Sequence, residues 1–408
     1  MNPDSTDSTA PDRPLRVAVL SEFVHPFHKG GAERRYYEIA RRLAARGHEV
    51  HWYAMQHWPG GRTELFEGIR LHGTRTAVDV YAPTGRRSVT AGLRVGLELT
   101  WALARSRRDF DVVDCSLYPF FHVFGARAVR PRTALVVTWY EYWGDHWYEY
   151  LGRRGLVGKH VERLAAAVPR RIVSVSDLTT SALLEAGVPA RRVTTVPLGV
   201  DTAWVDSIPP ARDESDVVFF GRLKNHKNVD LLLRALAVVK SRRPRVRCAV
   251  IGDGPERERL ERLAGELGLD GSVRFHGELS DEDVIATAKA SKVFVHPSTK
   301  EGGGSIALLE ANACGLPAIA IRHPLGIDSS LVLDGETGWW VDEPAPDALA
   351  SAISSALDDQ AVAGRRPARS DACRAFARGY DWDRVATRCE EIYRDAVAPV
   401  LRHQRVPA

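Results

Sequence analysis

Short apolar runs alternate with amphipathic stretches along this chain. The first run, RVAVL, covers Arg16–Leu20, and a stretch from Ala32 to Arg46 follows it with apolar residues three or four positions apart. Another strand-like run, EVHWY, begins at Glu49. Short apolar runs are typical of strands buried on both faces, whereas the longer spacing is typical of a helix with one buried face. The pattern predicts a β–α–β unit that opens a parallel sheet.

The same alternation continues to the end of the chain. Further strands are expected at Val112–Val113, Ala134–Thr138, Arg171–Val175, Val193–Val196, Val217–Phe220, Cys248–Ile251, Val273–Gly277, Lys292–Val295 and Ala318–Ile321. Further helices are expected at Val229–Ser241, Ser305–Cys314 and Asp381–Val397. Strands that alternate with helices form parallel sheets with helices on both faces, so the expected fold class is α/β with doubly wound, Rossmann-like domains.

The length of 408 residues fits two domains better than one. A proline-rich, charged stretch around Pro209 and Pro210 suggests where the two domains join. The expected parts are a disordered lead-in at 1–14, a first domain at 15–198, a linker at 199–215, a second domain at 216–378 and a C-terminal helix at 379–400.

Composition is that of a globular protein, with 44% hydrophobic and 26% charged residues. The net charge of +4 is small, and pairs such as Arg34-Arg35 and Arg41-Arg42 are dispersed, so we expect them on solvated faces. Nucleic-acid-binding proteins gather such cations into one patch, and we therefore expect no nucleic-acid partner. No uncharged apolar run approaches the roughly 18–20 residues of a membrane span. The polar N-terminal segment lacks the apolar core of a signal peptide, which predicts a cytoplasmic protein.

Five cysteines are scattered through the sequence, and no two form a CxxC pair. An odd number without close spacing argues against a disulfide framework and against a thiolate metal site. We therefore expect buried or inert thiols in a reducing compartment and no bound metal.

A triple glycine stands between a predicted strand and a predicted helix in the second domain. Gly302, Gly303 and Gly304 are followed by Ser305, which is placed to cap the helix. Glycines before a helix let backbone N–H groups approach an anion, and the helix dipole favours negative charge there. Glu310, inside the helix, could hold sugar hydroxyls. The stretch predicts a phosphate-and-sugar site, although alone it would more often be a glycine-rich turn with a surface glutamate.

Two cations follow the predicted strand Val217–Phe220. Arg222 and Lys227 lie five positions apart, and cations at the carboxyl end of a parallel strand suit a diphosphate. Alone they would be surface charges, but the glycine turn follows 75 to 80 residues later and favours a ligand. The turn that begins at Gly252, GDGPER, lacks the third glycine of a dinucleotide fingerprint, so we do not expect NAD.

A stretch dense in tryptophan and tyrosine follows the predicted strand Ala134–Thr138. Seven of the twelve residues at 139–150 are Trp or Tyr, with acidic residues and a histidine between them. Aromatic rings can stack on sugar rings, and carboxylates can hold hydroxyls or amines. The candidate acceptor-binding residues are Tyr140, Glu141, Asp145 and His146. The alternative is an aromatic lid that covers the domain cleft.

The glycine block resembles the signature of the family 4 glycosyltransferases, which are retaining, use nucleotide sugars and have the GT-B fold. Glu301-Gly302-Gly303-Gly304 and Glu310-Ala311-Asn312-Ala313-Cys314-Gly315, with Pro317, fill most of that signature. Two positions depart from it. Eight residues, rather than seven, separate Glu301 from Glu310, so either the loop carries one extra residue or Gly302 occupies the first Glu position. Tyr140-Glu141 stands where many members have His-Glu.

The resemblance implies two Rossmann-like domains that face a central cleft, with the last helix crossing back to the first domain. It implies transfer of a sugar from a UDP- or GDP-linked donor with retention of configuration, without a cofactor or a required metal. Arg222 and Lys227 are then the diphosphate ligands, Glu310 holds the ribose and Glu301 the donor sugar. Further donor-binding candidates are Gly30, Gly31, Arg274, Gly302, Gly303, Gly304 and Ser305.

The acceptor stays open between a saccharide, a cyclitol and a lipid-linked glycan. A lipid-linked acceptor would bring arginines near 34–42 and 153–154 into weak contact with anionic lipid at the inner face of the membrane. The two departures favour one alternative function, a catalytically silent, glycosyltransferase-like binding subunit. A GT-B epimerase or phosphorylase has no positive support in the sequence, which shows no pyridoxal-phosphate lysine motif.

Overall fold

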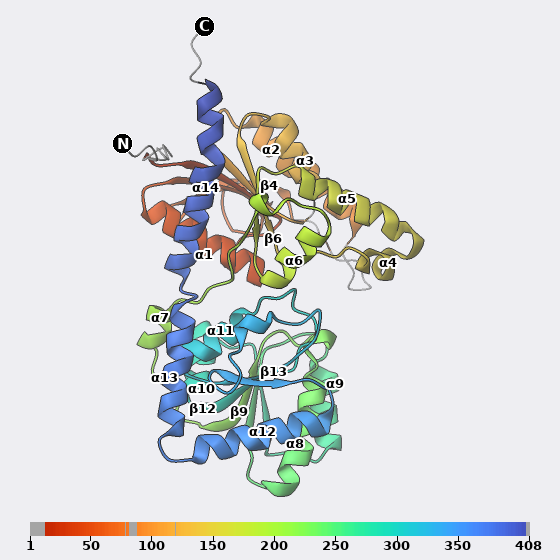
Figure 1. Cartoon of the computed structure of the whole chain (residues 1–408), viewed down its shortest axis with the longest axis vertical. Helices are drawn as coiled ribbons and strands as arrows, with labels where there is room; N and C mark the ends of the chain where they lie inside the picture. Colours follow the sequence, from red (N-terminus) through yellow and green to blue (C-terminus); the bar gives the residue numbers. More distant parts are fainter. Residues whose placement is uncertain (1–12, 78, 81–87, 119, 405–408) are drawn as a thin grey trace, which may run out of the picture. The chain divides into compact units, whose positions relative to one another are not determined.

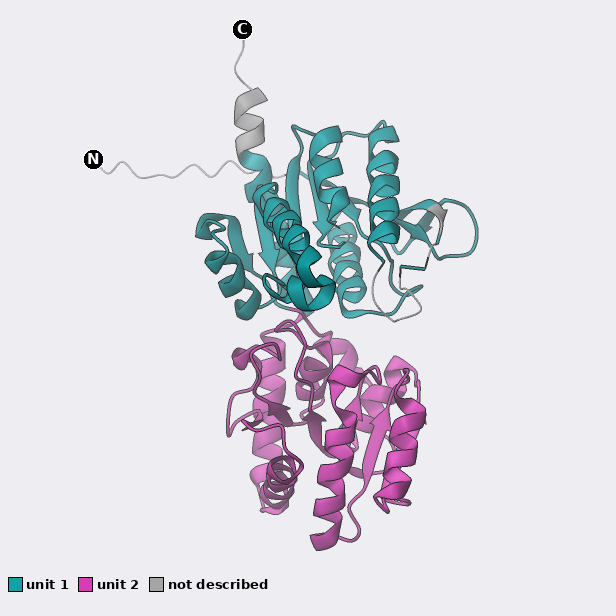
Figure 2. Cartoon of the chain, turned by 90° about the vertical axis from the view of Figure 1, so that its right-hand side faces the viewer, with its two compact units in different colours: residues 1–197, 382–408 teal, residues 198–381 magenta. Residues whose placement is uncertain are grey.

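The computed structural model describes residues 13–77, 79–80, 88–118 and 120–404 (Figure 1). The chain divides into two compact units, one of residues 1–197 with 382–408 and one of residues 198–381 (Figure 2). Most of the expected lead-in, residues 1–12, lies outside the described residues. All five cysteines are free and buried. Among the described residues, no helix is both long enough and apolar enough to cross a membrane.

The first unit contains an eight-stranded sheet of order β3-β4-β2-β1-β5-β6-β7-β8, parallel except for the antiparallel pair β3–β4. Its strands are β1 Arg16–Leu20, β2 Glu49–Gln56, β3 Thr63–Phe66, β4 Ile69–Thr76, β5 Val112–Ser116, β6 Ala134–Trp139, β7 Arg171–Ser174 and β8 Val193–Thr195. Its helices are α1 Gly31–Ala45, α2 Val89–Arg105, α3 Phe121–Val129, α4 His146–Leu151, α5 Gly155–Ala167, α6 Asp177–Glu185 and α14 Trp382–Gln404, with 3-10 turns η1 Gly152–Arg154 and η2 Ala190–Arg192.

Alternate strand residues of the first unit face two different helical layers. Cys115 of β5 packs into an apolar core with α2 and α3. Its neighbour Asp114 faces the other layer, where the hydroxyls of Tyr36 in α1 and Tyr393 in α14 donate hydrogen bonds to its carboxylate. Burial raises the pKa of the Asp114 carboxyl. This buried polar contact attaches the C-terminal helix to the sheet.

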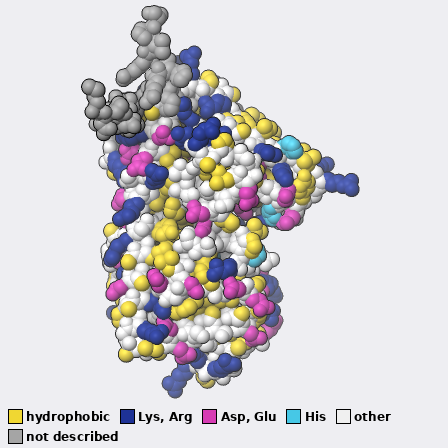
Figure 3. Space-filling view, in the orientation of Figure 1, with side chains coloured by type: hydrophobic (Ala, Val, Ile, Leu, Met, Phe, Trp, Pro, Cys, Tyr) yellow, Lys and Arg dark blue, Asp and Glu magenta, His cyan; other side chains and the backbone are white. Residues whose placement is uncertain are grey.

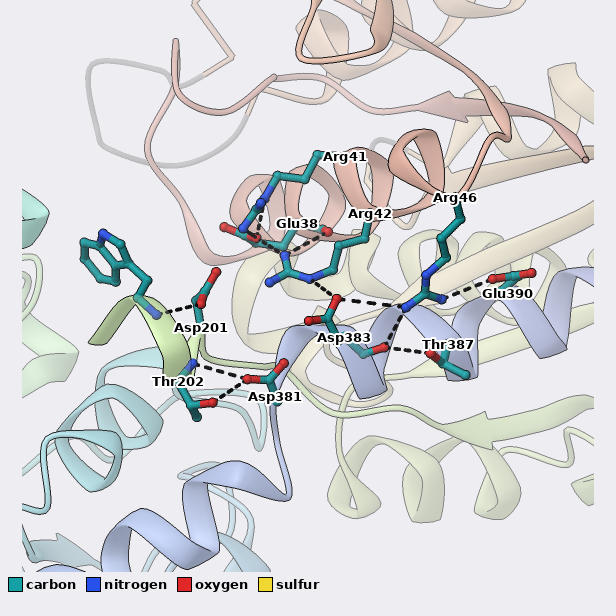
Figure 4. Close-up of polar contacts among 11 residues, drawn as sticks. Glu38, Arg41, Arg42, Arg46, Asp201, Thr202, Asp381, Asp383, Thr387 and Glu390 are labelled. Atoms are coloured by element: carbon teal, nitrogen blue, oxygen red, sulfur yellow. Dashed lines mark hydrogen bonds and ion pairs between the residues drawn. The ribbon is translucent and has the colours of Figure 1, made fainter. Parts of the chain in front are cut away.

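Ion pairs also join α1 to α14 (Figure 4). The guanidinium of Arg42 pairs with Glu38 and lies 2.9 Å from Asp383, while Arg46 lies 3.1 Å from Glu390. The expectation that the arginine pairs are solvated is wrong for Arg42, of which 8% is exposed. A buried guanidinium is tolerated here because carboxylates from its own helix and from α14 surround it.

Arg35 also contradicts that expectation, because it is fully buried. Its guanidinium donates to the carbonyl of Val196 and contacts the sulfur of Cys389. Arg35 and Arg42 are therefore buried and do not fit the expected contact between the arginines at 34–42 and a membrane.

The second unit contains a six-stranded parallel sheet of order β11-β10-β9-β12-β13-β14. Its strands are β9 Ser215–Phe220, β10 Cys248–Ile251, β11 Val273–Gly277, β12 Ser291–His296, β13 Ala318–Ile321 and β14 Gly338–Val341. Its helices are α7 Thr202–Ser207, α8 Val229–Arg242, α9 Arg257–Glu266, α10 Asp281–Lys289, α11 Ile306–Ala313, α12 Pro346–Ala361 and α13 Arg365–Arg378, with 3-10 turns η3 Asn225–Lys227 and η4 Ser329–Leu331.

The expected linker at 199–215 is not an irregular connection, because it contains α7 and belongs to the second unit. Asp201 caps α7 by accepting from the amide of Trp204, and Thr202 donates its hydroxyl to Asp381 (Figure 4). The ammonium of Lys289 donates to the carbonyl groups of Val205 and Ile208, at and just beyond the end of α7. Short polar side chains at a helix start are strong caps, which explains a helix in a proline-containing stretch.

Candidate active site

The second sheet reverses its strand order between β9 and β12. From β9 the chain runs outward to β10 and β11, and from β12 it runs outward to β13 and β14. The loops that leave two such central strands separate, and ligands of open α/β sheets bind in the crevice between them. Here these loops are 221–228 after β9 and 297–305 after β12. They contain most of the predicted donor-site residues.

Lys227 and Glu301 meet between these two loops. The ammonium nitrogen of Lys227 lies 2.5 Å from Oε1 of Glu301. Backbone contacts hold the same loops together, because the amide of Thr299 and the hydroxyl of Ser298 both donate to the carbonyl of His226. The structure therefore brings together two residues that the sequence places far apart.

The carboxylate of Glu301 is charged although it is largely buried. Burial by itself raises the pKa of Glu301, but Lys227 and His296 outweigh it, and the net shift is downward. Burial lowers the pKa of His296 to about 4, so its ring is neutral near pH 7. Its Nε2 atom lies 3.0 Å from the hydroxyl oxygen of Ser305 and 3.6 Å from Glu301. The crevice thus contains one strong ion pair beside a neutral imidazole.

The triple glycine forms a bend that pairs with a neighbouring loop. Gly302 and Gly303 have φ values of 61° and 90°, a region that glycine adopts without strain. The amide of Gly303 donates to Gly326, and the carbonyl of Gly303 accepts from Asp328. The N–H group of the donor-binding candidate Gly303 is therefore already engaged by Gly326, so Gly303 is not expected to donate to a phosphate. The amides of Gly304 and Ser305 stay candidates for that role.

Ser305 caps α11, as predicted, by accepting a hydrogen bond from the amide of Leu308. The N-terminus of this helix follows the glycine bend directly, so its dipole adds positive potential there. Glu310 lies within α11 and is 8% exposed. A carboxylate oxygen can accept hydrogen bonds from sugar hydroxyls, so the position of Glu310 in the helix that follows the glycine bend is compatible with the expected ribose contact.

Arg222 lies on the exposed surface of the loop after β9. The backbone of this loop is fixed, because the amides of Gly221 and Leu223 donate to Ile251 and Asp253. The GDGP turn is needed for that contact: a Cβ atom on Gly252 would lie 2.0 Å from the carbonyl oxygen of Gly221. These glycines therefore have a structural reason to be present.

Arg274 is not brought to the two loops. It lies on β11, the edge strand, which β10 separates from β9. Its guanidinium is 3.5 Å from Asp213, which precedes the first residue of β9. This contact directs the side chain toward the amino ends of the strands, whereas ligands bind at the carboxyl ends. The structure thus does not bring this side chain to the loops after β9 and β12, and a place beside the base stays a prediction.

In the first unit, Gly30 and Gly31 lie where the loop after β1 enters α1. The hydroxyl of Tyr140 donates to the carbonyl of Ala32 in the first turn of that helix, at 3.3 Å. Burial raises the pKa of Tyr140. The structure therefore brings the glycine loop and the segment after β6 together at the carboxyl edge of the sheet.

The other candidate acceptor residues lie further along the same segment. Asp145 pairs with Lys159 at 2.5 Å, and His146, the first residue of α4, pairs with Glu149 at 2.5 Å. Glu141 is partly buried. Of the four candidates, Tyr140 is the one whose hydrogen bond to the start of α1 is described above.

Many aromatic rings of 139–150 pack inside the first unit. Trp139 and Trp147 belong to its apolar core, and Tyr142, Trp143 and Tyr150 pack against them. The density of aromatic residues therefore reflects packing as well as any contact with a ligand.

Two family models match the chain. The model described as Glycosyltransferase Family 4 matches residues 29–204, and the model described as Glycosyl transferases group 1 matches residues 201–374. Together they cover both units and both sets of loops. The chain belongs to the family 4 glycosyltransferases.

Two relatives of this glycosyltransferase have names that state a glycosyl-transfer activity. The D-inositol 3-phosphate glycosyltransferase of Acidothermus cellulolyticus is 29% identical and covers 95% of this chain and 92% of its own length. The GDP-mannose-dependent alpha-(1-6)-phosphatidylinositol monomannoside mannosyltransferase of Mycolicibacterium smegmatis is 34% identical, but the match covers 48% of this chain and 56% of the relative.

Solved structures show that the fold is GT-B. Sucrose-phosphate synthase from Thermosynechococcus elongatus matches with a TM-score of 0.76 and 20% identity, covering 94% of this chain and 100% of the other. Anabaena HepE, solved in complex with UDP, matches with a TM-score of 0.71 and 18% identity over 93% of this chain and 99% of the other.

The structure bears on the unusual spacing between Glu301 and Glu310 in this glycosyltransferase. The backbone around the first glutamate is fixed, because the amides of Glu301 and Gly303 donate to the carbonyl groups of Leu325 and Gly326. This arrangement directs the side chain of Glu301 to Lys227. It favours a longer loop over a shift of the first glutamate position to Gly302.

Sequence reasoning missed Glu162 of α5. Its carboxylate accepts from the amides of Trp143 and Gly144 and from the indole of Trp147, at 2.9, 2.9 and 3.0 Å. Glu162 is fully buried, and it fixes the segment that carries the acceptor candidates. A lone glutamate on the apolar side of a helix was the available signal, but its partners could not be read from spacing.

Proposed function

We propose that this glycosyltransferase moves a sugar from a UDP- or GDP-linked donor to a hydroxyl of a saccharide, cyclitol or lipid-linked glycan, with retention of anomeric configuration. It acts on the cytoplasmic side. The pairing of Lys227 with Glu301 carries the proposal, because it supports a cation near the N-terminus of α11, and both features favour a bound diphosphate. The names of the two relatives, with a cyclitol phosphate and GDP-mannose, support the same classes of substrate.

The leaving diphosphate must be stabilised as the anomeric carbon–oxygen bond breaks. Lys227 and Arg222 offset the growing negative charge, and the amides of Gly304 and Ser305 can donate to the phosphate. In the proposed step, the acceptor oxygen attacks on the face that the phosphate leaves. Its proton passes to the departing phosphate oxygen, which explains why no titrating base stands at Tyr140. Side-chain cations perform the neutralisation, so the proposal includes no metal.

The carboxylates have separate roles in this proposal. Glu310 holds the ribose hydroxyls of the nucleotide. When the diphosphate binds to Lys227, the carboxylate of Glu301 leaves Lys227 and accepts a hydrogen bond from a hydroxyl of the donor sugar. On the acceptor side, Tyr140 and the nearby Glu141, Asp145 and His146 orient the attacking hydroxyl.

A panel of UDP- and GDP-sugars with candidate acceptors tests this function. The measurements are release of the nucleoside diphosphate and mass of the product, with product anomer determined by NMR. Arg222→Ala should cut turnover several hundredfold, whereas Arg243→Ala, an exposed arginine paired with Asp358, should not. Addition of EDTA should leave turnover unchanged. Absence of turnover with every donor would contradict the proposal.

A second candidate is a catalytically silent binding subunit. Two observations favour it: Glu301 already neutralises Lys227, and Tyr140 replaces the usual histidine. It predicts binding of UDP or GDP without sugar transfer or donor hydrolysis. Detectable turnover in the donor panel would eliminate it.

A further inference from the structure

Helix α2 has an apolar outer face. Val89, Leu93, Leu97 and Trp101 recur at every fourth position and are 56%, 42%, 60% and 51% exposed. The buried face of the same helix contains Val95, Leu99 and Leu103. A surface helix normally has a single apolar stripe, which faces the core. Single exposed apolar residues need no explanation, but an aligned set about 18 Å long does.

A hollow of about 520 Å³ adjoins this outer face. Its lining includes Arg62, Thr74, Leu97, Trp101, Arg105 and Val129. Apolar surface forms most of the wall, and the two arginines are its only lining cations among the described residues. The hollow extends the exposed stripe sideways, toward the strand β4 that carries Thr74.

Cations accompany the stripe. The guanidinium carbon of Arg105 lies 3.8 Å from the ring centre of Trp101. Arg94 stands beside the stripe one turn before Glu98, and their side chains are 3.3 Å apart. With Arg62 at the hollow, three arginines accompany one carboxylate. This combination of an apolar face, a tryptophan and flanking arginines is the composition of a helix that lies in a membrane interface.

We propose that the outer face of α2 docks on a lipid bilayer that contains anionic headgroups. The stripe would enter the boundary between headgroups and acyl chains, while Arg62, Arg94 and Arg105 would contact lipid phosphates. In Figure 3, hydrophobic side chains reach the surface along the upper right edge of the first unit, with arginine and lysine beside them. The docking needs no donor or acceptor, so it goes beyond the proposed sugar transfer and can fail independently of it.

A second copy of the chain is the less suitable occupant. A single-helix stripe of four half-exposed side chains is smaller than the roughly 800 Å² per partner of a stable complex. A two-fold axis parallel to α2 would also bring Arg94 and Arg105 toward their own copies, which places like charges together. A bilayer with anionic headgroups has neither disadvantage.

Vesicle flotation of the full chain tests the docking. The probes are vesicles of phosphatidylcholine alone and of phosphatidylcholine mixed with phosphatidylglycerol, at low and high salt. The wild type should float with the mixed vesicles and should be released by salt. The double variant Leu97→Ser/Trp101→Ser should lower the partition coefficient at least about tenfold. The variant Arg94→Gln/Arg105→Gln should lower it severalfold and weaken the salt dependence.

A matched control replaces exposed apolar residues elsewhere. Leu333→Ser/Val362→Ser changes two side chains of the second unit that are 41% and 49% exposed, and it should float like the wild type. Circular dichroism and UDP binding check that each variant folds. Failure of the wild type to float with mixed vesicles, equal flotation with phosphatidylcholine alone, or unchanged flotation of the stripe variant would overturn the proposal. So would a dimer in light scattering that the stripe variant dissociates.

Discussion

The ammonium of Lys227 lies 2.5 Å from the carboxylate of Glu301, across the point where the second sheet reverses its strand order. The pair joins the loop after β9 to the loop after β12. The carboxylate of Glu301 thereby occupies one side of the Lys227 ammonium. In the proposed function, a diphosphate oxygen would approach the ammonium from that side. Under the proposed function, donor binding would replace the carboxylate of Glu301 on Lys227 by a phosphate oxygen.

Removing the charge of Glu301 should separate nucleotide affinity from sugar transfer. Glu301→Gln leaves Lys227 without its internal anion, so UDP or GDP should bind about fivefold more tightly, equivalent to roughly 1 kcal/mol. Transfer should fall about 10- to 100-fold, because the donor sugar loses a charged hydrogen-bond acceptor. Calorimetry and product formation measure the two effects. Glu336→Gln, an exposed control in the same unit, should change neither, and weaker nucleotide binding by Glu301→Gln would contradict the exchange.

Glu162 should make stability depend on pH. Burial raises the pKa of Glu162 from 4.5 to about 7, so the folded chain keeps a proton that the unfolded chain loses. The stability from this proton is present below about pH 4.5 and is lost as the pH rises through 7. Between pH 5 and 8 the wild type should lose roughly 2–3 kcal/mol relative to Glu162→Gln.

Urea unfolding of the first unit at the two pH values measures this difference. Glu185→Gln, which replaces an exposed carboxylate of α6, should follow the wild type at both pH values. A constant difference between the wild type and Glu162→Gln would show that the carboxyl titrates normally.

Adjacent arginines of α1 should differ in their effect on stability. Arg42→Ala leaves the buried carboxylate of Glu38 with a weaker partner and breaks the contact with Asp383, so unfolding free energy should fall by about 3 kcal/mol. Arg41→Ala removes a more exposed partner of Glu38 and should cost less than about 1 kcal/mol. Urea unfolding distinguishes the two. Equal losses would mean that burial of Arg42 contributes nothing.

The strands were predictable because each forms an apolar run between polar loops. The run at Arg16–Leu20 is β1 itself, and the run at Cys248–Ile251 is β10. The strand β3, TELF, was missed because its side chains are mostly exposed and carry no such run. Helix α7 was missed because the prolines after it dominated the composition of the expected linker.

The donor-site residues could be named from the sequence, but their contacts could not. Lys227 and Glu301 were both candidates, yet no spacing predicts an ion pair between loops 74 positions apart. Gly303 was a donor-binding candidate, but the partner of its amide, Gly326, belongs to a loop with no sequence signal. Burial of Arg42 depends on Asp383, which lies 341 positions away.

Calorimetric titration of UDP and GDP into the wild type, Lys227→Ala and Lys292→Ala tests the pyrophosphate site most directly. Lys292 is a lysine of the same unit that pairs with Asp216, at the amino end of β12. Lys227→Ala should bind the preferred nucleotide at least about tenfold more weakly, because a charge-assisted contact to phosphate is lost, and Lys292→Ala should bind like the wild type. Unchanged affinity in Lys227→Ala, or no binding of either nucleotide by the wild type, would contradict a pyrophosphate site between the loops after β9 and β12.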